Sequence, residues 1–376
     1  MGGYALIYLD HAATTPVRTE VIKAMSPYFE MHFANASVGY KAARDSRRAI
    51  DTARSQVAAA IGAKRSEIYF TSGGSESDNW AILGAAFAHP EKKHIITTCI
   101  EHHAVLHTCQ FLEKIGYDVT YLPVDELGRV SPADVRNAIR PDTLMISVMM
   151  ANNEIGTIEP IDEIASVAKA AGVLMHTDAV QAAGHIPIDV SELNVDLLSM
   201  SAHKFYGPKG IGALYIRSGV VLTNLIHGGA QERGLRAGTE NTPAIVGMGA
   251  ALELACTEMA EEESKIRQLR RHLIEKLAGV PGLRINGDPE RTLPGVVHVT
   301  VDQADTSLLL MQMDMRGIAV SAGSACASGA SERSHVIRAL GIAGEREADI
   351  RFSLGKENTE TEIDTAVEAL SCCLKR

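Results

Sequence analysis

The sequence of 376 residues lacks the features that direct a protein into a membrane or out of the cell. No run of apolar residues approaches the roughly 18 that a membrane span requires. The start, MGGYALIYLDHAATTP, lacks a basic segment and reaches Asp10 and His11 too early for a signal peptide. Gly2 is not followed by the Ser or Thr that myristoylation requires at position 6. We therefore expect a cytoplasmic protein.

The sequence also lacks an excess of positive charge, because 36 Lys and Arg face 46 Asp and Glu, a formal net charge of -10. This balance disfavours DNA and anionic membranes as partners and favours a small-molecule substrate. Repeats and low-complexity tracts are absent as well. The six cysteines are Cys99, Cys109, Cys256, Cys326, Cys372 and Cys373. They have no metal-ligand spacing, and the chain is too long to need a disulfide framework, so we expect reduced thiols and no metal site.

Short runs rich in β-branched residues alternate along the chain with segments of helical periodicity. Examples of the runs are EIYF at 67–70, LMISVMM at 144–150 and LLSM at 197–200. Helical periodicity is clear in DEIASVAKAAG at 162–172. This alternation predicts an α/β fold on a mainly parallel sheet.

The length of the chain favours one large domain with a smaller partner. A long helical pattern from Pro243 to about Leu277, with Thr242 as its N-cap, would link the two domains. We predict a large domain at 15–255 and a small α+β domain formed by 1–14 and 256–376.

Two groups of polar residues follow predicted strands, at the sheet edge where α/β folds bind ligands. Gly74 precedes a predicted helix whose first residue is Ser75. The N-terminus of a helix after a glycine can bind a phosphate, although Gly-Ser turns before helices are common. Asp178 ends the strand LMHTD, with Gln181 three residues later. This pair is typical of a ligand-binding carboxylate and amide, or of an ordinary helix N-cap.

Lys204, in the stretch SMSAHKFYGPKG, is the third candidate and indicates which ligand these groups of residues could bind together. A lysine in a loop, taken alone, is most often a surface residue. A Schiff-base amine, a carboxylate for a pyridine nitrogen and a phosphate cradle are together the parts of a pyridoxal phosphate site. The sequence therefore predicts pyridoxal 5'-phosphate as cofactor, bound by the large domain.

Nine motifs in order resemble the cysteine desulfurases of the NifS/IscS type, in the class V aminotransferase group of pyridoxal-phosphate enzymes. They are YLDHAATTP, FTSGGSESDN, EHHAVL, ANNEIGT, HTDAVQ, SAHKFYGPKGIGAL, ERGLRAGTEN, SAGSACAS and RFSLG. The resemblance covers nearly the whole chain. It implies pyridoxal-phosphate fold type I, in which helices flank a mainly parallel seven-stranded sheet and a smaller α+β domain carries the catalytic cysteine loop.

The resemblance also implies roles for residues around the cofactor ring. Lys204 would carry the Schiff base, and Asp178 would pair with the pyridine nitrogen. Gln181 and Asn153 would lie near the ring oxygen. His102 of EHHAVL would stack on the ring as a catalytic residue, although without the motif a capping or core histidine is the plainer interpretation. The neighbouring His103 matches nothing in the family, and we interpret it as structural.

The phosphate of the cofactor would be held by residues of both subunits of a homodimer. Gly74, Ser75, Ser201 and His203 would bind it from one chain, and Thr239 of RAGTEN would reach it from the partner. The family has Ala-Thr where this chain has Gly74 and Ser75, and this change keeps the hydroxyl and the backbone donors.

Arg351 and Cys326 complete the implied site. Arg351 of IRFSLG would clamp the substrate carboxylate with two hydrogen bonds, beside Asn153, although a strand arginine could equally be a salt-bridge partner. Cys326 would be the nucleophile. A lone cysteine is most often inert, but SAGSACASGAS has little to bury and favours an accessible loop. The long-loop subgroup has Ser-Ser-Gly-Ser-Ala-Cys here, and this chain differs only at Ala322.

The implied activity removes sulfur from L-cysteine, giving L-alanine and a persulfide on Cys326 for iron-sulfur cluster scaffolds or tRNA-thiolation proteins. A selenocysteine lyase or another class V enzyme would use the same Lys204 and Asp178. A non-enzymatic sulfur-assembly scaffold is the least favoured alternative, because the catalytic residues are intact. The short end AVEALSCCLKR leaves docking to a scaffold open, and Cys372 and Cys373 are either a sulfur relay or incidental.

Overall fold

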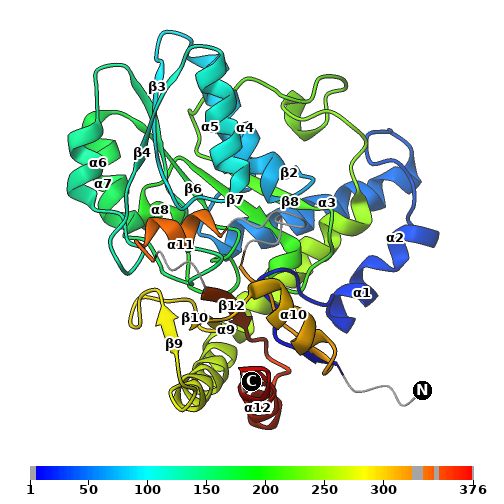
Figure 1. The fold of residues 1–376 in the computed structure, drawn as a ribbon. Helices are drawn as coiled ribbons and strands as arrows, with labels where there is room; N and C mark the ends of the chain where they lie inside the picture. The colour runs from blue at the N-terminus through cyan, green and yellow to red at the C-terminus, as the bar shows by residue number, and fades with distance from the viewer. Residues whose placement is uncertain (1–5, 324–332, 343–346, 375–376) are drawn as a thin grey trace.

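The computed structural model describes residues 6–323, 333–342 and 347–374, and its centre is a seven-stranded sheet of order β2-β8-β7-β6-β5-β3-β4 (Figure 1). The strands are β2 (Ile68–Thr71), β3 (His94–Thr98), β4 (Asp118–Leu122), β5 (Thr143–Ser147), β6 (Leu174–Asp178), β7 (Leu197–Ser201) and β8 (Gly212–Ile216). All neighbours pair in parallel except that β8 is antiparallel to both β2 and β7. The predicted α/β fold with a mainly parallel seven-stranded sheet is confirmed.

Helices cover both faces of this sheet, as a parallel sheet requires. Leu197 of β7 packs with Trp80 in the core under one face, whereas the next residue, Leu198, belongs to the core under the other face. The first face is covered by α4 (Gly74–Ala88) and α5 (His103–Lys114). Helices that contribute to the second core are α1 (Thr19–Met25), α3 (Lys41–Ala60), α6 (Pro132–Ala138), α7 (Ile161–Ala171), α8 (Val190–Leu193) and the first half of α9.

A smaller unit lies below the large sheet in Figure 1. It contains a three-stranded antiparallel sheet of order β12-β10-β9 and a two-stranded parallel pair, β1 with β11. Its elements are β1 (Ile7–Tyr8), β9 (Leu283–Asn286), β10 (Val296–Asp302), α10 (Thr306–Asp314), β11 (Ile318–Ala319), β12 (Glu347–Ser353) and α12 (Glu360–Leu374). The remaining short helices are α2 (Pro27–Glu30), α11 (His335–Ala339) and the 3-10 turns η1 (Arg65–Glu67), η2 (Ala202–Lys204) and η3 (Glu232–Gly234).

The long helix α9 (Thr242–Leu277) runs through both units. Ala255 packs in the core of the large sheet, and Ile266 packs in the core of the small one. The N-cap is Asn241, whose side chain accepts a hydrogen bond from the Ala244 N–H at 3.3 Å. The predicted N-cap, Thr242, is therefore wrong by one residue, because the amide of Asn241 reaches the free N–H. The predicted division into 15–255 against 1–14 and 256–376 stays a prediction.

No described helix has the length and apolar character that would let it cross a membrane.

Candidate active site

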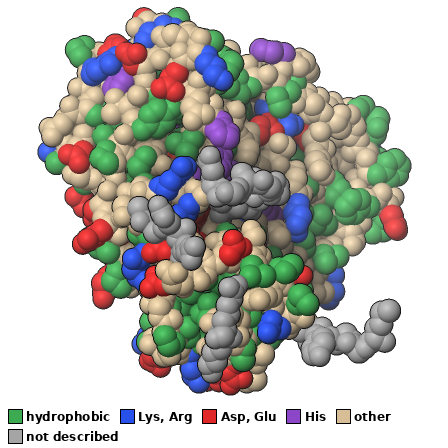
Figure 2. Space-filling model, viewed as in Figure 1, with side chains coloured by type: hydrophobic (Ala, Val, Ile, Leu, Met, Phe, Trp, Pro, Cys, Tyr) green, Lys and Arg blue, Asp and Glu red, His purple; other side chains and the backbone are tan. Residues whose placement is uncertain are grey.

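A cavity of about 210 Å³ lies at the carboxyl ends of β6 and β7, beside the starts of α4 and α5. Figure 2 shows histidine side chains grouped near the middle of one face of the molecule. Ten of the twelve residues singled out from the sequence line the cavity: Gly74, Ser75, His102, Asn153, Asp178, Gln181, Ser201, His203, Lys204 and Arg351. Residues from many separate stretches of the chain therefore meet at one place.

Lys204 stands in η2, directly after β7. Its Nζ donates hydrogen bonds to the carbonyls of Ala12 at 2.6 Å and Ala13 at 2.9 Å. Burial and, to a smaller extent, the positive charge of Arg351 lower the pKa of the amine to about 8, although the carboxylates of Asp10 and Asp178 oppose the change. An amine with this pKa is partly neutral near physiological pH, as a nucleophile must be.

Asp178 ends β6 and is buried. Its Oδ1 accepts the Val180 N–H at 2.8 Å, so the carboxylate also stabilises a local turn, but no helix starts here and the alternative interpretation as a helix N-cap does not apply. Burial raises the pKa of this carboxyl to about 6, although the Val180 bond and the charge of Lys204 oppose the rise. Nearby, Nε2 of Gln181 donates to the carbonyl of Ala12 at 3.0 Å.

The start of α4 has the features of a phosphate cradle. Gly74 is the first residue of this 15-residue helix, and a Cβ added there would lie 3.7 Å from Cβ of Ser201 and 2.6 Å from Val180. A side chain at position 74 would therefore clash with Val180, and glycine avoids this contact. Ser75 is exposed, and the ring of His203 lies 3.1 Å from the Thr14 hydroxyl. Helix N–H groups, hydroxyls and an imidazole fit a phosphate.

His102 is both a capping residue and a residue of the cavity. Its Nδ1 accepts the backbone N–H of Ala104 at 3.1 Å, which caps α5. Burial, together with the charge of Lys204, lowers the pKa of the ring to about 4. His102 is thus a neutral imidazole whose proton is on Nε2, because Nδ1 is an acceptor.

Arg351 is the residue of β12 that enters the site, and only 1% of it is exposed. Its Nη2 donates to Oδ1 of Asp10 at 2.8 Å. Its Nη1 donates to the carbonyls of Asn153 at 2.8 Å and Gly323 at 3.2 Å. In this structure the arginine is therefore an ion-pair partner, as the alternative interpretation held, and it also lines the cavity.

Thr239 and Cys326 are the two remaining residues singled out from the sequence. Thr239 is exposed and does not line the cavity. Cys326 lies outside the described residues. Gly323, the last described residue before that gap, lines the cavity, and so does His335, which follows shortly after it.

Several cavity residues were not singled out from the sequence. His103, interpreted as structural, lines the cavity, and its ring lies 4.9 Å from that of His107 and 4.8 Å from that of His335. The spacing of His103 and His107 places both on one helical face, a signal that was available. Glu154 and Asp78 were also missed. Burial raises the pKa of Glu154 to about 7, and its Oε2 accepts the hydroxyl of Ser334 at 2.6 Å.

A buried polar network lies behind Asp178. Asp78 is 1% exposed, and burial together with the neighbouring Asp178 raises its pKa well above the usual value. The ring of His176 lies between the hydroxyls of Ser147 at 2.8 Å and Ser199 at 3.1 Å, with Asp78 at 3.7 Å. These groups come from β5, β6, β7 and α4, and among them Asp78 interacts electrostatically with Asp178.

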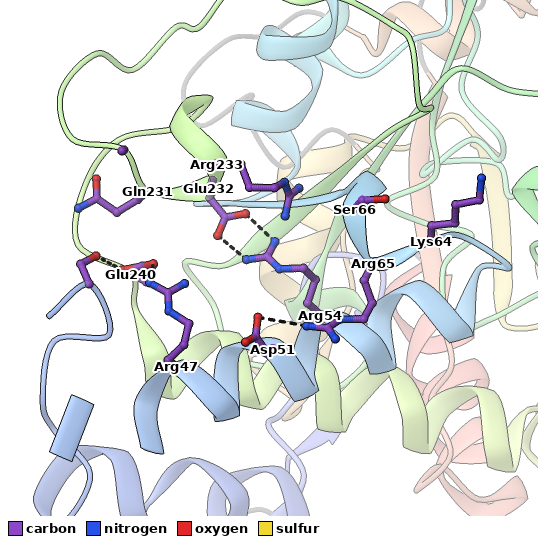
Figure 3. A pocket seen from close by; sticks show the side chains of 12 residues that line it. Arg47, Asp51, Arg54, Lys64, Arg65, Ser66, Gln231, Glu232, Arg233 and Glu240 are labelled. Atoms are coloured by element: carbon purple, nitrogen blue, oxygen red, sulfur yellow. Dashed lines mark hydrogen bonds and ion pairs between the residues drawn. The ribbon is translucent and has the colours of Figure 1, made fainter. Parts of the chain in front are cut away.

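A larger cavity, about 1110 Å³, lies away from this site beside α3 and η1. Figure 3 shows arginines around it, joined to acidic side chains. Arg54 pairs with Glu232 at 2.6 Å, and Arg65 pairs with Asp51 at 3.2 Å. Since these charges are compensated within the chain, the smaller cavity at the strand ends is the better candidate for catalysis.

Comparison with known proteins identifies the family. The sequence profile of the class V aminotransferases matches residues 7–366. The chain belongs to the class V aminotransferase family. Class V aminotransferases are pyridoxal-phosphate enzymes, and the predicted resemblance to the cysteine desulfurases of this group is confirmed.

Relatives within the class V family are cysteine desulfurases by name. The chain is 54% identical over 366 residues to "Cysteine desulfurase IscS" of Methanosarcina thermophila, covering 97% of this chain and 91% of that relative. It is 52% identical to the protein of the same name from Clostridium botulinum, covering 98% and 94%. Among solved structures, a "NIFS-like protein" superimposes with a TM-score of 0.93 at 38% identity, covering 98% of this chain and 99% of that one. "SspA in complex with cysteine" has a TM-score of 0.83 at 41% identity, covering 94% and 100%.

Proposed function

We propose that this chain is a pyridoxal-phosphate-dependent cysteine desulfurase, which takes sulfur from L-cysteine and releases L-alanine. The observation that carries the proposal is the meeting of Lys204, Asp178 and Arg351 around one cavity, in a chain closely similar to named desulfurases. The names of those relatives do not favour a selenocysteine lyase or another class V activity.

The residues of the cavity fit the cofactor. Asp178 would face the pyridine nitrogen, and Gln181 and Asn153 would lie near the ring oxygen. The phosphate would be held by Gly74, Ser75, Ser201 and His203. When bound, pyridoxal phosphate supplies a ring that withdraws electrons from the α-carbon of an amino acid.

Lys204 and His102 would handle protons in this site. With a pKa of about 8, Nζ of Lys204 can give up or accept a proton near neutral pH. The neutral ring of His102 would stack on the cofactor, with its Nδ1 held by the Ala104 N–H. Both side chains are therefore held in position by hydrogen bonds to backbone groups.

Cys326 would be the sulfur acceptor. Its thiolate attacks the sulfur of the substrate, and an S–S bond forms as the bond between sulfur and the β-carbon breaks. The electron pair of the broken bond stays with the β-carbon, which takes up a proton and leaves as part of L-alanine. The persulfide on Cys326 would then pass sulfur to acceptors such as iron-sulfur scaffolds or tRNA-thiolation proteins in the cytoplasm.

A homodimer belongs to the same proposal. Thr239 is exposed here and would reach the phosphate of the partner chain. The segment between α2 and α3, with its flanks, exposes Phe29, Met31, Phe33 and Tyr40, each by more than half of its surface. Apolar side chains gathered in one short segment are typical of an interface, and a second copy of the chain would cover them.

The decisive experiment measures alanine and sulfide released from L-cysteine in the presence of a thiol reductant. Cys326→Ser should keep the visible spectrum of the cofactor and still change it on adding L-cysteine, yet release no alanine. Cys372→Ser is the matched control and should release alanine at the parent rate. If Cys326→Ser also releases alanine at the parent rate, the nucleophile is elsewhere and the proposed mechanism is wrong.

A further inference from the structure

Arg351, which lines the cavity of the proposed substrate site, forms an ion pair with Asp10, which lies beside the cavity and does not line it. Nη2 of Arg351 lies 2.8 Å from Oδ1 of Asp10, although the two residues are 341 positions apart. The arginine side chain is 2% exposed and the aspartate side chain 18% exposed. A carboxylate of the chain therefore occupies the guanidinium that would bind the carboxylate of an amino acid.

The hydrogen bonds of Arg351 show which edge of its guanidinium a substrate can use. Nη1 is taken by the carbonyls of Asn153 and Gly323. Nη2 is taken by Asp10, with the Ser321 hydroxyl more distant at 3.4 Å. Nε is buried and has no partner among the described residues. A carboxylate binds two adjacent N–H groups of arginine, so the edge formed by Nε and Nη2 is the one to consider, and Asp10 holds half of it.

We propose that Asp10 is an internal competitor of the substrate: it neutralises Arg351 while the site is empty and releases Nη2 when an amino-acid carboxylate binds. The proposal rests on the proposed function, because it takes Arg351 as the carboxylate clamp. Asp10 is thereby a specificity residue. When its carboxylate leaves Arg351, only a ligand with a carboxylate of its own can neutralise the guanidinium again.

The surroundings of Asp10 allow such an exchange. Its backbone is fixed beside β12, because the neighbouring His11 N–H donates to the Ser353 carbonyl at 3.1 Å and the Ser353 N–H donates to Leu9 at 2.8 Å. Its side chain is partly exposed, so the carboxylate can turn toward water without moving the backbone. A buried guanidinium without an anion is strongly unfavourable, which is why the pair forms in the empty site and why a substrate carboxylate must take its place.

A static role for Asp10 predicts the opposite behaviour. If Asp10 only holds Arg351 in position for the substrate, removing its charge loosens the guanidinium and weakens binding. If Asp10 competes with the substrate, removing its charge strengthens binding. The sign of the change in affinity therefore separates the two roles.

The test titrates L-cysteine into the cofactor-loaded Cys326→Ser protein, which does not turn over, and follows visible absorbance. Adding Asp10→Asn should lower the Kd for L-cysteine about tenfold, within the usual range of coupling between two ligands. Asp10→Ser, a second way of removing the charge, should change the Kd in the same direction. Asp305→Asn, at an exposed N-cap of α10, is the matched control and should leave the Kd unchanged.

Cysteamine, which has the thiol and amine of cysteine but no carboxylate, gives a second readout. Its Kd should change much less than that of L-cysteine in Asp10→Asn, so the preference for L-cysteine over cysteamine should rise. An unchanged or higher Kd for L-cysteine in both Asp10 variants overturns the proposal for Asp10 alone. If Arg351→Gln binds L-cysteine as tightly as the parent does, the assignment of the clamp fails, and the role of Asp10 fails with it.

Discussion

Lys204 and Ala12 lie 192 positions apart in the sequence, and Nζ of the lysine donates a 2.6 Å hydrogen bond to the carbonyl of the alanine. The same N-terminal segment is fixed to η2 by its backbone, because the Thr15 N–H donates to the His203 carbonyl at 3.0 Å. The Thr15 hydroxyl accepts the Tyr206 N–H at 2.8 Å on the other side of the lysine. The start of the chain therefore holds the amine in place before any cofactor is joined to it.

The first prediction concerns the reactivity of Lys204. Its pKa of about 8 means that the amine is protonated below that pH and neutral above it, whereas ordinary lysines need a pH above about 10. Attachment of pyridoxal phosphate to the cofactor-free protein should therefore speed up as the pH rises through about 8. Borohydride reduction and peptide mapping should place the label on Lys204, and a label on a different lysine would contradict the assignment.

The second prediction concerns the buried ion pair of Arg54 and Glu232. Glu232 accepts from both terminal nitrogens of Arg54 at 2.6 Å and from the Phe70 N–H at 3.0 Å. Glu232→Gln leaves a buried arginine uncompensated, which should cost about 3–5 kcal/mol of stability. Thermal unfolding of the cofactor-loaded protein measures the loss. Asp45→Asn, which breaks the exposed pair with Arg48, should leave the midpoint unchanged.

The third prediction concerns the glycine that opens α4. A methyl group at Gly74 would lie 2.6 Å from Cγ2 of Val180, so Gly74→Ala should destabilise the protein by about 1–3 kcal/mol. Adding Val180→Ala should restore most of the loss, because it removes the atom in contact. Gly39→Ala, where nothing lies within 4 Å, is the control. No rescue by the second substitution would mean that backbone geometry, not contact with Val180, requires the glycine.

The fourth prediction concerns pH and Glu101. Burial raises the pKa of this carboxyl to about 8, against about 4.3 in an unfolded chain. Folding takes up a proton between these values, so the contribution of Glu101 to stability is present in acid and is lost as the pH rises through about 8. Relative to its difference from the parent at pH 4, Glu101→Gln should gain at least about 1 kcal/mol of stability over the parent at pH 9, the equivalent of one pKa unit.

The comparison for Glu101 is made by denaturant unfolding at both pH values. Glu275→Gln, at an exposed position of α9, should follow the parent at both. A constant difference between Glu101→Gln and the parent would contradict a proton held by Glu101 in the folded state.

The fifth prediction concerns the proposed dimer. Phe33→Asp places a charge on the most exposed of the large apolar side chains between α2 and α3, so the dimer should dissociate at lower concentration in sedimentation measurements. Because Thr239 would then be missing from the partner's phosphate site, cofactor affinity should fall together with dimer affinity. Phe111→Asp, on an exposed position of α5, should change neither. A monomeric Phe33→Asp that keeps its cofactor would contradict the shared site.

The sequence by itself determined the central sheet and most of the site. The strands predicted from short β-branched runs agree closely with β5 and β7, and, as expected, Asp178 ends β6 and Lys204 follows β7. Since the carboxyl ends of parallel strands meet at one edge, residues placed after two strands were bound to lie together. The domain boundaries and the chemical roles of the site residues stay predictions.

Only the tertiary structure decided what surrounds these residues. Asp10 meets Arg351, and Glu154 meets Ser334, through packing between segments 341 and 180 positions apart. Local hydrophobic periodicity cannot predict such contacts, because it reflects only which face of a helix or strand is buried. The pKa of Lys204 is likewise a property of the fold, since removal of water and the nearby charge of Arg351 change it, and both arise only when distant parts of the chain close around the amine.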